Sequence, residues 1–169
     1  MAYRHRAFEP GAAYHMTARG IDGLSIFPTA VDCFSFLGLL RRVTGRVGWT
    51  IVSWCLMGTH YHLIVFAPAE PRISWAMQTL NSVYAREFNH RLARRGHVFG
   101  ERFTDTLVAS ERHLDAAIDY LLENPVRAGL VSEALDWPWS GDHLLVPRPV
   151  QRIVTPLAQD RDTLVRRRG

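Results

Sequence analysis

The chain has 169 residues, of which 47% are hydrophobic and 21% charged, as expected for one soluble globular domain. No stretch predicts a signal peptide or a membrane span, so we expect a cytoplasmic protein without membrane contact. The isolated Cys33 and Cys55 predict no disulfide framework. The net charge is +4 and all twenty basic residues are arginine. This composition favours a nucleic-acid partner, although solubility or a base composition that favours arginine codons would produce it too.

The first predicted strand covers residues 12–19. Tyr14 and Met16 share one face of this strand, while His15, Thr17 and Arg19 share the other. Gly20 and Gly23 then predict a loop after this strand.

A helix is predicted next, with Thr29 as its N-cap and Gly45 at its end. Two apolar runs follow, one over 49–56 and one beginning at His60. Because only Met57, Gly58 and Thr59 separate them, we expect an antiparallel hairpin.

The second half of the chain predicts a long helix over 73–95 and a strand over 104–109. Ser110 is a suitable N-cap for another helix, which Pro125 is expected to end. Pro125 can also begin a short further helix that stops at Gly129.

This order of elements predicts an α+β fold of the ferredoxin-like βαββαβ type. An antiparallel sheet would carry helices on one face, with an extra C-terminal helix that bears Tyr120. We expect residues 1–141 to form the domain and residues 142–169 to form an irregular basic tail.

The most informative stretch holds His60 and His62. Residues two apart on a strand share a face, so the two imidazoles should lie side by side and can form half of a metal site. The alternative is that one or both histidines are only structural.

The last helix offers Asn124 as a candidate third ligand and Tyr120 as a candidate reactive group. The two residues are four apart, so they share a helix face. Imidazole and amide ligands together would suit Mg²⁺ or Mn²⁺, and the Tyr120 phenolate could attack a phosphate. Alternatively, Tyr120 covers apolar surface and Asn124 caps the turn at Pro125. Tyr84 is a rival nucleophile, but it falls in the apolar stripe of its helix.

Taken together, these pieces resemble the HUH single-strand DNA transposases that use one tyrosine, and most closely the REP-associated tyrosine transposases and their insertion-sequence relatives. The matching runs occur in the family's order and cover roughly residues 12–141: YHMTARG at 14–20, LMGTHYHL at 56–63, YAREFN at 84–89, GHVFGERF at 96–103, YLLENPVRAGLV at 120–131 and WPWS at 137–140. One departure is Gly58-Thr59, where family members usually carry Pro-Asn.

The resemblance implies that His60, His62 and Asn124 hold a divalent metal, Mg²⁺ or Mn²⁺, and that Tyr120 is the nucleophile. It also implies that Arg19, Arg102 and Arg127 contact DNA. The expected activity is metal-dependent nicking and joining of single-stranded or hairpin DNA through a covalent 5′-phosphotyrosine intermediate, by a monomer or a homodimer.

Two other functions stay open at this point. The fold could be a catalytically inactive module that binds a DNA or RNA hairpin. It could also be a metal-dependent hydrolase that cuts DNA without a covalent step.

Overall fold

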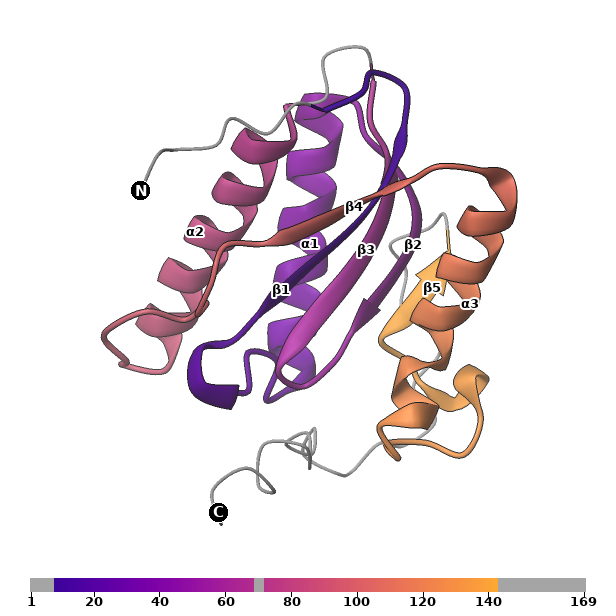
Figure 1. The fold of residues 1–169 in the computed structure, drawn as a ribbon. Coiled ribbons are helices and arrows are strands. Elements are labelled where there is room, and N and C mark those ends of the chain that lie inside the picture. Colours follow the sequence, from indigo (N-terminus) through magenta and orange to yellow (C-terminus); the bar gives the residue numbers. More distant parts are fainter. Residues whose placement is uncertain (1–7, 69–71, 143–169) are drawn as a thin grey trace, which may run out of the picture.

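In a computed structural model, which describes residues 8–68 and 72–142, the chain forms a five-stranded antiparallel sheet and three α-helices (Figure 1). The strand order is β4-β1-β3-β2-β5. The strands are β1 (Ala13–Arg19), β2 (Thr50–Leu56), β3 (His60–Phe66), β4 (Thr104–Val108) and β5 (Ser140–Asp142). The helices are α1 (Ala30–Val47), α2 (Ile73–Arg91) and α3 (Glu111–Arg127), with short 3-10 turns at Ile21–Gly23 and Ala134–Asp136. The predicted α+β class and antiparallel sheet are confirmed.

The two faces of the sheet carry different helices (Figure 1). Tyr61 of β3 is fully buried, packs on Phe36 of α1 and donates a hydrogen bond to Asn81 of α2. Its neighbour His62 points the other way and contacts Tyr120 of α3. The main aromatic core therefore lies under α1 and α2, while α3 covers the opposite face.

Helix α1 runs past the predicted end at Gly45 because Val47 still belongs to its buried face. The helix is closed by Gly48, whose φ of 70° is a left-handed conformation that glycine adopts without strain. Helix α2 ends at Arg91, before the predicted end, because Ala93 turns left-handed and Arg94 donates its backbone N–H to the Asn89 carbonyl.

Pro125 does not end α3, which continues to Arg127. The chain turns away from the helix at Gly129, just after the Ala128 cap, where the φ is 67° and the backbone N–H of Leu130 bonds the Pro125 carbonyl. Gly129 is thus the predicted stop, but the predicted break at Pro125 and the second short helix are wrong.

The edge strand β5 was not predicted. It pairs with β2, and two tryptophans before it fix its position: the Trp137 indole donates to the Leu56 carbonyl, and the Leu56 N–H donates to the Trp139 carbonyl. The predicted tail over 142–169 lies outside the described residues except for Asp142.

Candidate active site

Strand β3 presents His60 and His62 side by side on the face that α3 covers. Their ring centroids are 5.0 Å apart, and both side chains are buried. Across the strand pair, His60 lies opposite Arg19 and His62 opposite Thr17 of β1. The prediction that His60 and His62 lie side by side on one face of a strand is therefore confirmed.

The Nδ1 atom of each ring contacts a threonine hydroxyl. His60 Nδ1 lies 3.0 Å from Thr59 Oγ1, and Thr59 belongs to the turn where the chain departs from Pro-Asn. His62 Nδ1 lies 3.0 Å from both Thr17 Oγ1 and His15 Nε2. Metal-bound histidines commonly use their second nitrogen in this way, so Nε2 is the nitrogen that each ring would offer to an ion.

His15 and Thr17 are site residues that were not predicted. The signal was present, because the alternation of β1 places both on the face of Arg19. What the local pattern lacked was the pairing register, which sets Thr17 opposite His62.

The electrostatic environment keeps His62 neutral. Burial, reinforced by His60, His15 and Arg19, lowers its pKa from 6.5 to about 2. Burial and His113 likewise lower the pKa of His15. Neutral imidazole is the form that binds a metal ion, so proton competition at His62 is weak at neutral pH.

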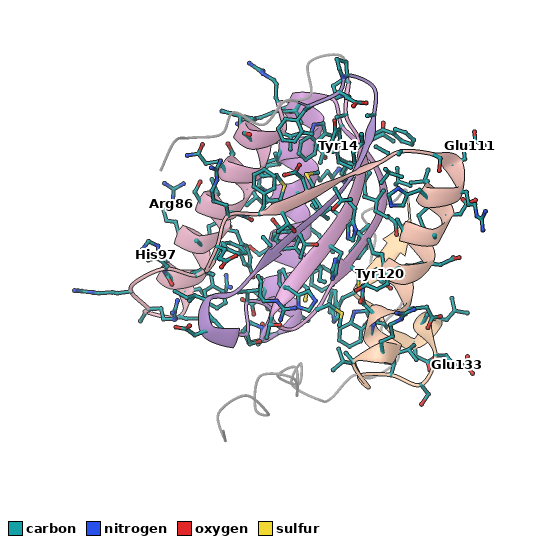
Figure 2. All side chains as sticks on the ribbon, viewed as in Figure 1. Tyr14, Arg86, His97, Glu111, Tyr120 and Glu133 are labelled. Carbon is teal, nitrogen blue, oxygen red and sulfur yellow. The ribbon has the colours of Figure 1, made fainter. Side chains whose placement is uncertain are left out.

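Helix α3 brings Tyr120 to these rings. The Tyr120 ring stands perpendicular to the His62 ring with centroids 6.4 Å apart, yet its side chain is 45% exposed (Figure 2). The Arg127 guanidinium lies over the same ring, 5.1 Å from its centroid. Tyr84, the rival, is fully buried and donates to the Ile26 carbonyl, so it packs rather than reacts.

Asn124 lies one helical turn beyond Tyr120. Its amide bonds a backbone carbonyl that Pro125 leaves without its usual helical donor. Proline has no N–H to donate to the carbonyl four residues earlier, which is that of Leu121. The Asn124 Nδ2 group donates to this carbonyl at 3.4 Å. Because Asn124 lies inside α3, it does not cap a new helix, and the capping interpretation is wrong.

The donors present are compatible with a divalent metal. No group of three or more His, Cys, Asp and Glu side chains able to hold an ion occurs within residues 8–68 and 72–142. A metal on His60 and His62 would therefore need an amide or a substrate oxygen to complete its shell. The Asn124 Oδ1 atom is a suitable donor, because Nδ2 is the atom that bonds the helix.

The three arginines predicted to contact DNA lie in two places. Arg19 is exposed at the end of β1 beside His60, and Arg127 lies over Tyr120. Arg102 instead lines a hollow between α2 and the loop before β4. None of the helices in the described part of the chain is long and apolar enough to cross a membrane.

The chain is similar to known transposases over most of its length. The family described as "Transposase IS200 like" matches residues 13–124. A Haemophilus influenzae protein named "Putative REP-associated tyrosine transposase" is 26% identical over 154 residues, which are 85% of this chain and 86% of that protein.

Two solved structures share the fold. A REP-associated tyrosine transposase bound to a REP hairpin gives a TM-score of 0.69 at 19% identity, covering 92% of this chain and 97% of that one. A "putative transposase" from Deinococcus radiodurans gives 0.51 at 18% identity, covering 73% and 97%. The family match spans more than half of the chain and includes the histidine strand and the Tyr120 helix, so the chain belongs to the IS200-like tyrosine transposases.

Proposed function

We propose that this protein cuts and rejoins single-stranded or hairpin DNA through a covalent link to Tyr120, with a divalent metal held by His60, His62 and Asn124. The observation that carries the proposal is the position of Tyr120, an exposed phenol whose ring contacts His62, the neutral member of a buried pair of neighbouring histidines. Membership of the IS200-like family supports the same reaction class.

The proposed chemistry is a reversible exchange of phosphodiester bonds. The Tyr120 oxygen attacks the scissile phosphorus and loses its proton, and the bond from phosphorus to the 3′ oxygen breaks. One strand leaves with a 3′-hydroxyl, while the other stays joined to Tyr120 through its 5′ phosphate. A 3′-hydroxyl from another strand can then attack the phosphotyrosine, which restores the phenol and joins the DNA.

The residues around Tyr120 orient the reacting groups. Arg127 contacts the tyrosine ring, and its positive charge is suited to the phosphate under attack. Thr17 and His15 hold the His62 ring, and Thr59 holds that of His60. A divalent metal on these rings would polarise the scissile phosphate and neutralise charge on its oxygens.

Hairpin DNA is the proposed substrate because a structural relative that covers almost all of this chain was solved with a REP hairpin. The chain's own contribution is an arginine-only set of cations, two of which flank the site at Arg19 and Arg127. Binding through such contacts should weaken steeply with salt, because it releases counterions from the phosphates.

The test compares Tyr120→Phe with Tyr14→Phe, which makes the same chemical change on the face of β1 opposite to His15, away from Tyr120 (Figure 2). Each protein is incubated with labelled hairpin and single-stranded DNA and Mn²⁺, and covalent adducts are resolved on denaturing gels. We expect adducts with the unmodified protein and Tyr14→Phe, but none with Tyr120→Phe.

The same gels separate the alternatives. A hydrolase would still cut DNA after Tyr120→Phe. A binding module would retain DNA in a native gel, yet the unmodified protein would neither cut it nor form an adduct. An adduct with Tyr120→Phe would refute the assignment of the nucleophile.

A further inference from the structure

A concave site lies away from Tyr120, between α2 and the loop that leads into β4. Its volume is about 710 Å³, within the range of pockets that enclose small ligands. Figure 2 shows His97, one of its lining residues, on the opposite side of the molecule from Tyr120. The hollow is therefore not part of the histidine site.

The wall of this pocket is held in place by hydrogen bonds. The backbone N–H of Ile21 bonds the Val98 carbonyl at 2.9 Å, and that of Gly100 bonds the Arg19 carbonyl at 3.1 Å. At the other end of the loop, the Asn89 amide donates to the Gly96 carbonyl at 2.8 Å. A loop anchored at both ends gives a pocket that needs little ordering when a ligand binds.

The chemistry of the lining suits a flat, polar-edged ligand. Phe99 supplies a half-buried aromatic ring, packed against the core rings of Tyr61 and Tyr84 at 6.3 Å from each. Gln78 and Asn81 supply amides. Aromatic rings stack on bases, and amide groups both donate to and accept from base edges.

Asn81 is held in a defined orientation. Its Oδ1 accepts a 2.6 Å hydrogen bond from the buried Tyr61 hydroxyl, so Nδ2 is the group that it can offer to a ligand. Arg102 and His97 add a basic rim for a backbone phosphate, beside one carboxylate, Glu101. This mixture fits an uncharged base on an anionic backbone better than it fits a purely anionic or apolar ligand.

The pocket is connected to the proposed active site through one strand end. Phe99 forms a β-bridge with Gly20, directly after Arg19, and Arg19 lies opposite His60 in the sheet. Arg19 and Gly20 therefore link the pocket loop to the histidine strand, and Arg19 is exposed at this link, where its charge suits a DNA backbone. We propose that the pocket binds an unpaired base of the single-stranded DNA whose phosphate lies at Tyr120; this inference rests on the proposed function.

The test fills the pocket and compares the result with a matched change outside it. Gln78→Trp places a bulky ring in the lining, whereas His90→Trp places one on an exposed position of α2 outside the lining. Circular dichroism verifies folding, and Gln78→Ala serves as a milder second variant. Binding of single-stranded oligonucleotides to the full chain is measured at fixed salt, with each nucleotide replaced in turn by an abasic one.

A base in the pocket predicts that one abasic position weakens binding to the unmodified protein and to His90→Trp by about tenfold, the scale of one lost stacking contact. Gln78→Trp should bind the intact strand as weakly as the unmodified protein binds the strand with that abasic position. The abasic replacement should then cause no further loss of affinity in Gln78→Trp. Gln78→Ala should show an intermediate loss.

The outcomes distinguish this site from the reaction. If the protein forms the Tyr120 adduct but Gln78→Trp binds every oligonucleotide as His90→Trp does, the pocket proposal is overturned and the proposed function survives. If the unmodified protein binds no single-stranded or hairpin DNA, both proposals fail.

Discussion

Stability at mildly acidic pH should depend on His62. In the unfolded chain this imidazole has an ordinary pKa of 6.5, whereas in the folded chain the pKa is about 2. The unfolded state therefore binds a proton below pH 6.5 that the folded state does not accept. The contribution is complete above pH 6.5 and is lost as the pH falls towards the folded value.

The loss can be calculated between two pH values. From pH 7 to pH 5, the imidazole of the unfolded chain goes from about one-quarter protonated to almost fully protonated, which costs about 2 kcal/mol of folding free energy. Any folded pKa below about 4 gives almost the same result, so the number depends little on the depth of the shift. In urea, this corresponds to a fall in the unfolding midpoint of about 1 M.

The assay is urea unfolding of the metal-free protein at both pH values. The His62→Gln variant should lose about 2 kcal/mol less than the unmodified protein, because other titrating groups are common to both. His97→Gln, a change on the exposed loop, should keep the full loss. Equal losses in all three proteins would refute the idea that His62 is buried as a neutral base.

Two further predictions concern α3. Pro125→Ala restores an N–H to the Leu121 carbonyl and should release the Asn124 amide, weakening Mn²⁺ binding by about tenfold, as measured by electron paramagnetic resonance. Unchanged affinity, in a helix that gains stability by losing its proline, would argue against an oriented Asn124 ligand. Arg127→Gln should slow adduct formation at saturating DNA by about two- to fivefold, with partial recovery in Arg127→Lys. An unchanged rate with weaker DNA binding would make Arg127 a phosphate contact alone.

The elements with strong periodicity could be predicted from the sequence, but their ends depended on other interactions. The alternation around His60 predicted β3, and the apolar stripe predicted α3. β5 was missed because Ser140, Gly141 and Asp142 have no apolar alternation. This strand owes its place to Trp137 and Trp139, which bond the backbone of a strand some eighty residues earlier.

For the candidate site, the sequence predicted neighbours within one element but not contacts between elements. The spacing of His60 and His62 was sufficient to place them on one face. The contacts of His62 with His15 and Thr17 depend on the register between β1 and β3, which no local pattern specifies. The resemblance to a family could propose His60 and His62 as ligands, but it could not show which groups contact their rings.

Pro125 is a residue at which the rule that proline ends a helix fails. A proline after Asn124 predicts a helix end, because the bond to the Leu121 carbonyl cannot form. The helix continues because Pro125 is buried and the Asn124 Nδ2 group donates to the Leu121 carbonyl in place of the missing N–H. That contact ties the amide nitrogen to the helix backbone, which leaves the amide oxygen as the atom available to an ion. Pro125, which removes one hydrogen bond from the helix backbone, thereby orients Asn124, the proposed third ligand. Asn124 lies one turn from Tyr120, the proposed nucleophile.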